Sequence, residues 1–260
     1  MNSKIDAMTA SPGPFSVAGA ARVPVKNRVS RWISRLGMTL GLLVTPGLAY
    51  AGACYIGSDG SDELVYLSEA NDASTARIVG PFGAPDIETL AKDPVTQNLF
   101  AADADTLGIV DLDTGGYSSL GTFGTALAAN GDLGTNLDLD DIDAMGFDPS
   151  TGVLYAVENS GGNGILFQVN TSTGALVPGA MGGGNDYLVV TGGTIDDLAV
   201  DAAGMMFVSL ADRLATVDLS ATGTVANVPL PNLFAPGLID MEGLAVDIND
   251  NLIGLSLIHI

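Results

Sequence analysis

An eight-residue acidic phrase occurs four times in this chain and limits its fold more than any other feature. Each copy has a large apolar residue, with a carboxylate two positions before it and an aspartate three positions after it. The apolar residues are Leu90, Met145, Leu198 and Leu244, the carboxylates are Glu88, Asp143, Asp196 and Glu242, and the aspartates are Asp93, Asp148, Asp201 and Asp247. Self-similarity at a regular spacing is the signature of a repeat architecture.

The spacing of the phrases matches one blade of a β-propeller. The closing aspartates are 55, 53 and 46 residues apart, and a blade of four short strands takes roughly 40–50 residues. After each aspartate come turn residues, as in Asp148-Pro-Ser-Thr-Gly152, and then an apolar run such as Val153-Leu-Tyr-Ala-Val157. Aspartate followed by proline favours a type I turn, and the run predicts a buried strand.

A second predicted hairpin completes each unit. An apolar strand ends in Asp111, Asn170 or Asp218, and a Thr-Gly pair then turns the chain. We expect these polar residues and the phrase aspartates to cap turns, and the equivalent aromatic residues Phe100, Tyr155 and Phe207 to form the core between blades. The prediction is an all-β fold, a β-propeller of four-stranded antiparallel blades, with about four blades present as an open partial propeller.

Residues 142–156 carry the pattern most completely, as Ile142-Asp-Ala-Met-Gly-Phe-Asp-Pro-Ser-Thr-Gly-Val-Leu-Tyr-Ala156. This phrase resembles the blade repeat of secreted bacterial β-propeller proteins, at the level of the NHL and YVTN repeat superfamily. The resemblance extends over most of residues 55–255. It implies a propeller and leaves the function open, because lectins, hydrolases, lactonases and scaffolds all use this fold.

The first 51 residues have the order of a secretory leader. Cations precede the apolar run Leu36–Val44, and Ala49-Tyr-Ala51 supplies the small residues of a cleavage site. The run is too short to span a bilayer; an N-terminal membrane anchor is the alternative. We therefore expect a leader over residues 1–51 and a secreted, periplasmic or cell-surface protein. Cys54, the only cysteine, forms no intrachain disulfide; lipidation there is a further alternative.

The other end of the chain stops within a predicted blade. We expect the blades to occupy residues 52–255 and the last five residues, 256–260, to be a non-native tail. The sequence therefore indicates a C-terminally truncated fragment whose arc of blades exposes strand edges, which is an aggregation hazard.

The net charge of the chain limits the classes of molecule that it can bind. After residue 51, three cations (Arg77, Lys92 and Arg213) stand against 29 acids, a net charge of −26. Such a surface repels nucleic acid and anionic membranes and attracts divalent cations. We expect no nucleic-acid partner, no membrane span in the mature chain, and an extracellular ligand or protein as the partner.

Little catalytic chemistry is available. The only histidine is His259, in the predicted tail, so residues 52–255 cannot form a Ser-His-Asp or Cys-His arrangement. Histidine-ligated metals are excluded for the same reason, and one cysteine cannot hold a structural zinc. What remains is carboxylate chemistry with hard cations, of which Ca²⁺ is the natural candidate.

The phrase begins the innermost strand of each blade, so its carboxylates should gather at one mouth of the central channel, beside Asp86, Asp141 and Asp240. The densest acidic stretch, residues 130–143, leads into one of these strands. The predicted metal-ligating set is Glu88, Asp138, Asp140, Asp141, Asp143, Asp196 and Glu242. A solvated acidic loop and a catalytic metal are the alternatives. We predict no catalytic residue.

Two functions compete. The first is a secreted, non-enzymatic propeller that serves as a binding or surface-display module, stabilised by Ca²⁺ through carboxylates at one channel mouth. The alternative is a Ca²⁺-dependent, lactonase-like hydrolase, in which carboxylates hold the ion and activate water. The scarcity of cations argues against phosphate substrates, and the absence of tryptophan after Trp32 argues against sugars. We favour the binding module.

Overall fold

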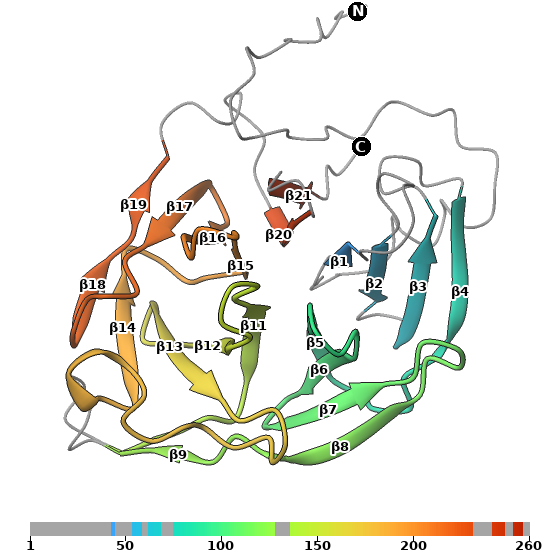
Figure 1. Ribbon diagram of the computed structural model, residues 1–260, viewed down its shortest axis with the longest axis horizontal. Coiled ribbons are helices and arrows are strands. Elements are labelled where there is room, and N and C mark those ends of the chain that lie inside the picture. Colours follow the sequence, from blue (N-terminus) through green and yellow to red (C-terminus); the bar gives the residue numbers. More distant parts are fainter. Residues whose placement is uncertain are drawn as a thin grey trace, which may run out of the picture.

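The molecule is a ring of antiparallel β-sheets (Figure 1). The computed structural model describes residues 43–44, 54–58, 62–68, 75–127, 136–230, 241–247 and 252–256. Within these ranges, three sheets have four strands, one has five because a linking strand joins it, and two have two strands. This arrangement confirms the predicted all-β propeller of four-stranded blades. Among the described residues, no helix has the length and apolar character needed to cross a membrane.

The blades follow one another along the chain. The first blade has β1 (Leu43–Val44), β2 (Cys54–Ser58), β3 (Glu63–Leu67) and β4 (Ala76–Pro81). The second has β5 (Ile87–Lys92), β6 (Leu99–Asp103), β7 (Thr106–Val110) and β8 (Tyr117–Thr122), and the third has β11 (Ile142–Phe147), β12 (Leu154–Ser160), β13 (Asn163–Val169) and β14 (Tyr187–Thr191). The fourth has β15 (Asp197–Val200), β16 (Met206–Leu210), β17 (Arg213–Val217) and β19 (Val228–Pro229), and the fifth sheet has β20 (Met241–Val246) and β21 (Leu252–Ser256).

Short strands link neighbouring blades. β9 (Thr125–Ala126) pairs with β10 (Leu137–Asp138) in the connection from the second blade to the third. β18 (Thr224–Ala226) pairs in parallel with β14 of the third blade, and β19 directly after it pairs with β17 of the fourth. This one segment therefore joins two blades at their outer edges.

The innermost strands contact one another in succession around the centre of the ring. β5 contacts β11, β11 contacts β15, β15 contacts β20, and β20 contacts β1. A small apolar cluster joins Ala245 of β20 to Cys54 and Leu67 of the first blade. The ring is thus bridged on its inner side, whereas the fifth sheet has two described strands where the other blades have four.

The predicted turn chemistry is confirmed where the structure describes the turns, which excludes the turn after Asp247. Asp93 accepts hydrogen bonds from the amides of residues 95 and 96, and Asp148 accepts them from residues 150 and 151. Asp111, Asn170 and Asp218 each accept from the amide two residues later. These polar side chains are therefore used by the turns that they open.

The predicted aromatic core is confirmed as well. Phe100, Tyr155 and Phe207 are buried in three successive clusters between blades. Phe100 packs on Phe147 of the next blade, with 5.6 Å between ring centroids. Because each cluster takes residues from two neighbouring blades, the sheets stabilise one another rather than standing alone.

Leu43 and Val44 lie within the predicted leader and form β1, which pairs with β2 at Tyr55 and Cys54 in the full chain. Cleavage after residue 51 would remove this short strand from the inner edge of the first blade. The domain boundaries remain a prediction.

A second repeated phrase, Gly-x-Phe-Gly, was not recognised from the sequence. It ends the outer strands β4 and β8, and places Phe82 and Phe123 in the core, 2% and 1% exposed. Their carbonyl oxygens accept hydrogen bonds from the amides of Tyr117 and Leu176, which belong to the next blade. The phrase therefore fastens each outer strand to the blade that follows.

The first glycine of this phrase allows two backbones to touch. A Cβ atom at Gly80 would lie 2.0 Å from the carbonyl oxygen of Thr114, and one at Gly121 would lie 2.3 Å from that of Thr173. Real Cβ atoms do not approach an oxygen so closely, so a side chain at either position would push two blades apart.

We expect Gly121→Ala to lower the free energy of unfolding by about 2–3 kcal/mol, because the added methyl group overpacks the contact between the second and third blades. Urea denaturation measures this. Gly116→Ala is the matched control, because its Cβ would lie 3.4 Å from the nearest atom, Thr114 Oγ1; it should cost less than about 0.5 kcal/mol. Equal effects of the two substitutions would contradict the proposed contact.

Candidate functional site

Three of the four carboxylates of the acidic phrase lie at β-bulges; Asp196, which precedes β15, does not. The pairing of β5 with β6 shifts register between Ile87 and Thr89, and so passes over Glu88. The same shift passes over Asp143 in β11 and over residue 242 in β20. A bulge leaves one residue out of the ladder and re-aims its side chain. The repeated carboxylate therefore stands at the one position of the strand that pairing does not use.

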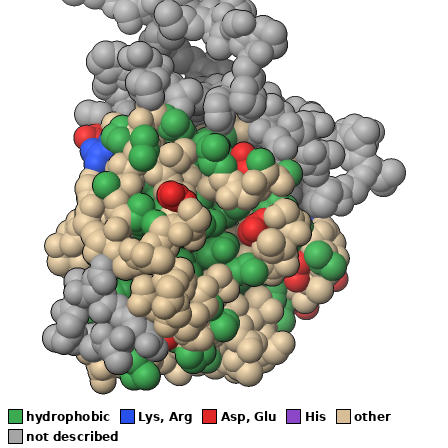
Figure 2. Space-filling model, turned by 60° about the vertical axis from the view of Figure 1, so that its left-hand side comes forward, with side chains coloured by type: hydrophobic (Ala, Val, Ile, Leu, Met, Phe, Trp, Pro, Cys, Tyr) green, Lys and Arg blue, Asp and Glu red, His purple; other side chains and the backbone are tan. Residues whose placement is uncertain are grey.

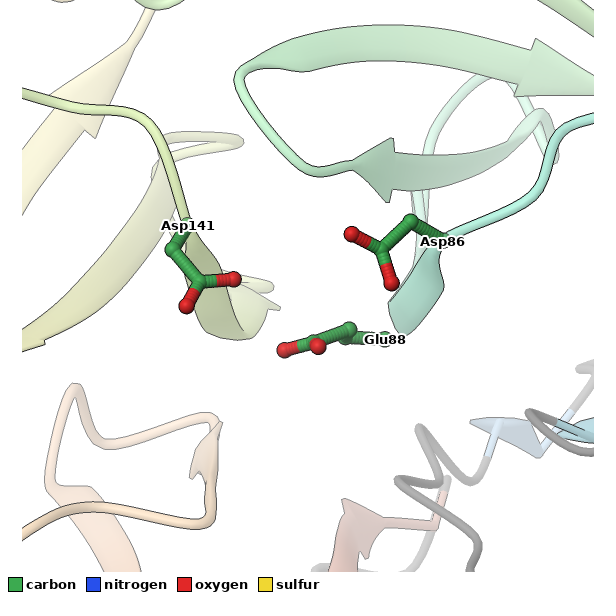
Figure 3. A group of neighbouring side chains, drawn as sticks. All are labelled: Asp86, Glu88 and Asp141. Carbon is green, nitrogen blue, oxygen red and sulfur yellow. The ribbon is translucent and has the colours of Figure 1, made fainter.

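Three carboxylates from two blades converge where the inner strands β5 and β11 begin (Figure 3). Asp86 and Glu88 come from the start of β5, and Asp141 immediately precedes β11. One ligand oxygen from each lies within 4.8 Å of the others. Glu88 is half-buried, and both aspartates are exposed. The backbone amide of Asp86 donates to Asp103 Oδ1 at 3.0 Å, which fixes the loop that carries it.

Other predicted ligands have different neighbours. Asp138 Oδ1 accepts a 2.8 Å hydrogen bond from the Thr125 hydroxyl across the β9–β10 pair. Asp143 Oδ2 accepts a 2.7 Å bond from the amide of Asn159, and burial raises the pKa of this aspartate above its usual value. The side chain of Asp140 is exposed. None of the three belongs to the convergent group found among the described residues.

The remaining predicted ligands lie on the later blades. Asp196 precedes β15, and its amide donates to the carbonyl of Ser209 at 2.9 Å. It lies outside the convergent group. Glu242 is part of β20, but its side chain lies outside the described residues, as do Asp240 and residues 128–135 of the densest acidic stretch.

Glu158 was missed by the sequence reasoning. It lies on β12 beside the convergent group, is 6% exposed, and accepts a 3.0 Å hydrogen bond from the amide of Asp140 at Oε2. Burial, with the charges of Asp140, Asp143 and Asp141, raises its pKa to about 7. The one sequence signal was an acid inside an apolar strand, where a carboxylate is costly.

Asp197 was also missed, although it follows Asp196 directly. It is 1% exposed. Its Oδ1 accepts from the amide of Leu198 at 2.8 Å, and its Oδ2 accepts from the amide of Leu244 in the fifth sheet at 2.7 Å. Burial raises its pKa well above the usual value. This carboxylate joins two inner strands, which is a structural role.

Acidic side chains are also scattered over the surface. In Figure 2 they appear singly among apolar and polar side chains rather than as one continuous patch. Acidity alone therefore marks no site on that face, and the convergence of Asp86, Glu88 and Asp141 is the feature that distinguishes the channel mouth.

Comparisons with known proteins support the fold alone. No protein-family model and no curated protein matches the sequence. The crystal structure of a nidogen/laminin complex is similar, with a TM-score of 0.52 at 14% identity, covering 84% of this chain and 71% of that one. Regucalcin, a calcium-binding protein from Agrobacterium tumefaciens, has a TM-score of 0.43 at 15% identity, with coverage of 80% and 78%. An auxiliary nutrient binding protein from Bacteroides thetaiotaomicron has 0.48 at 11%, with coverage of 79% and 45%.

The raised pKa of Glu158 predicts a pH-dependent stability. The folded protein holds this proton up to about pH 7, against an ordinary value of 4.5. The stabilisation that comes from protonated Glu158 is therefore full below about pH 4.5 and is lost as the pH rises through about 7. We expect Glu158→Gln, which keeps an acceptor for the amide of Asp140, to reduce the fall in unfolding free energy between pH 4.5 and 8 by about 1–3 kcal/mol.

Chemical denaturation across this pH range measures the difference. Glu63→Gln, at a half-buried position on β3, makes the same change of charge and should leave the pH slope nearly as in the unmodified protein. If both variants flatten the slope equally, the effect comes from overall charge and not from Glu158.

Proposed function

We propose that this protein is a secreted, non-enzymatic β-propeller that binds Ca²⁺ at one mouth of its channel and uses that mouth to bind an extracellular ligand. The convergence of Asp86, Glu88 and Asp141 from two blades carries the proposal. Three negative charges held so close repel one another unless a cation joins them or protons are taken up.

The donor set fits a hard cation. All three groups offer oxygen, and the described part of the mouth adds no imidazole or thiolate to the group. Ca²⁺ takes six to eight oxygens, and carboxylates can supply one or two each. Water or oxygens of a bound ligand would complete the shell. Softer metals favour nitrogen and sulfur donors, so Ca²⁺ is the ion that these residues support best.

Binding is favoured over catalysis by the position of Glu158. Its pKa of about 7 suits a general acid or base, and this supports the alternative of a Ca²⁺-dependent, lactonase-like hydrolase. However, the side chain is 6% exposed, and Oε2 already accepts the amide of Asp140. A group that must exchange protons with a substrate needs to reach it.

An ion at this mouth would join the second and third blades, because Asp86 and Glu88 belong to one and Asp141 to the other. Binding to the folded chain alone stabilises it by mass action. The same ion could present open coordination positions to the hydroxyl or carboxylate oxygens of an extracellular ligand. The cation is therefore proposed to have both a structural and a binding role.

We expect millimolar Ca²⁺ to raise the melting temperature, and titration calorimetry to give a dissociation constant on the order of 10⁻⁴–10⁻³ M, as in other extracellular modules. The double variant Glu88→Gln with Asp141→Asn should lose both effects. Asp113→Asn with Asp105→Asn removes the same charge from exposed turn residues and should keep them. Loss of Ca²⁺ binding in both pairs would assign the effect to general acidity, and no response in the unmodified protein would refute the site.

Secretion is tested independently of the ion. When the gene is expressed in a bacterium with a functional export pathway, we expect the exported protein to begin at Gly52, because Ala51 ends the predicted cleavage site. Sequencing of the mature N-terminus measures this. An uncleaved chain held in the membrane would support the anchor instead, and a lipid on Cys54 would show the lipoprotein alternative.

A further inference from the structure

Asn170 opens a turn that carries an acceptor motif for N-linked glycosylation. The motif is an asparagine, any residue except proline, and then serine or threonine, and Asn170-Thr171-Ser172 matches it. No other asparagine of the sequence has a serine or threonine two positions later. A three-residue motif is weak evidence by itself, so the argument depends on how the folded turn holds these residues.

The side chain of Asn170 is held at its oxygen and free at its nitrogen. Oδ1 accepts a 2.9 Å hydrogen bond from the amide of Ser172, which forms an Asx turn. Asn170 is exposed, and its Nδ2 makes no hydrogen bond with any residue that the structure describes. The turn therefore does not use the atom to which a glycan would be attached.

Backbone hydrogen bonds fix the conformation of this turn. The amide of Asn170 donates to the carbonyl oxygen of Ala175 at 2.8 Å. The carbonyl oxygen of Asn170 accepts from the amides of Thr173 and Gly174 at 3.2 and 2.8 Å. Ser172 is exposed, as Asn170 is. Both of the residues that define the motif are therefore presented to solvent on an ordered turn.

The equivalent turns of the neighbouring blades show that the cap does not require asparagine. Asp111 in the second blade accepts a 2.9 Å hydrogen bond from the amide of Asp113. Asp218 in the fourth blade accepts a 2.9 Å bond from the amide of Ser220. A carboxylate thus satisfies the fold at this position. The amide nitrogen of the third turn is a departure that the fold does not demand, and such departures are where functional residues are expected.

The turn of the fourth blade also shows how a hydroxyl can lie beside the capping side chain. Ser220 Oγ donates to Asp218 Oδ1 at 2.6 Å. Ser172 is the equivalent of Ser220, two residues after the cap. The backbone of this type of turn therefore lets the hydroxyl of the motif reach the side chain that it accompanies.

We propose that Asn170 is the acceptor of an N-linked glycan on the exported protein. Nδ2 forms a bond to the anomeric carbon of a sugar that is carried on a lipid diphosphate. The bond between that carbon and the diphosphate oxygen breaks, the diphosphate leaves with the bonding electrons, and one Nδ2 proton passes to a base of the transferase. An oligosaccharyltransferase of the export pathway supplies the donor sugar and the base. The proposal rests on the export proposed above and not on Ca²⁺.

The glycan would lie away from the carboxylate group. Asp141 immediately precedes β11, and β11, β12 and β13 are successive antiparallel strands. β13 therefore ends at the opposite end of its sheet from the start of β11, and Asn170 directly follows β13. A glycan at this turn leaves the convergent carboxylates uncovered, so modification and ion binding are expected to be independent.

Glycosylation in vitro tests the proposal separately from export. The purified full chain and a peptide of residues 166–175 are incubated with a single-subunit oligosaccharyltransferase and a lipid-linked oligosaccharide, and the products are analysed by mass spectrometry. We expect the folded chain to gain one glycan, on Asn170, which peptide N-glycosidase removes. Asn170→Asp and Ser172→Ala should lose the glycan completely. Ser172→Thr, which preserves the motif, is the matched control and should keep it.

Modification of the peptide without modification of the folded chain would overturn the proposal, because the turn would then be closed to the enzyme. A lack of modification in both would overturn it as well, since the sequence would not be an acceptor. Thermal melts complete the test. Asn170→Asp should melt as the parent does, because a carboxylate makes the same cap in the other blades; a marked loss of stability would assign the asparagine a structural role.

Discussion

The innermost strand of every blade has one edge that faces the channel, and buried amides on that edge need acceptors that their own sheet does not supply. In two of the four phrases the chain meets this need with the residue before the apolar anchor, Thr89 in one and Asp197 in the other. Thr89 Oγ1 accepts from the amide of Met145 at 2.9 Å, and Asp197 Oδ2 accepts from that of Leu244. Each acceptor lies on the preceding blade, so satisfying one amide also fixes the neighbouring sheet.

This constraint explains why the phrase has separate structural and exposed parts. The apolar anchor and the residue before it are buried. The bulge leaves the carboxylate that precedes them out of the strand pairing. At the junction of the third and fourth blades, Asn159 supplements the arrangement, because its side-chain amide exchanges two 2.8 Å hydrogen bonds with the backbone of Ile195. Asp143 accepts a hydrogen bond from the backbone amide of Asn159. The carboxylate of this phrase therefore has a structural role.

The sequence predicted what depends on local patterns and missed what depends on register. Turn caps such as Asp148 follow from the residues beside them, and the spacing of the phrases was enough to predict the blades. Asp86, Glu88 and Asp141 were expected at one channel mouth, but Asp143 and Asp138 have partners that only the strand pairing reveals. Glu158 and Asp197 were missed because their acceptor roles link segments 18 and 47 residues apart.

The junction of the second and third blades differs from the later one in a way that favours a cation. Its buried staple is the neutral hydroxyl of Thr89, whereas the junction of the fourth blade with the fifth sheet is held by the Asp197 carboxylate. Thr89 joins the two blades through one neutral hydroxyl, and Asp86, Glu88 and Asp141 converge at the same junction. Asp197 joins two neighbouring inner strands because each of its carboxylate oxygens accepts a hydrogen bond from an amide of one of them. An ion bound by Asp86, Glu88 and Asp141 would join the inner strands of the second and third blades in a similar way. Because the ion can be removed, this junction would also be the one that solution conditions can loosen.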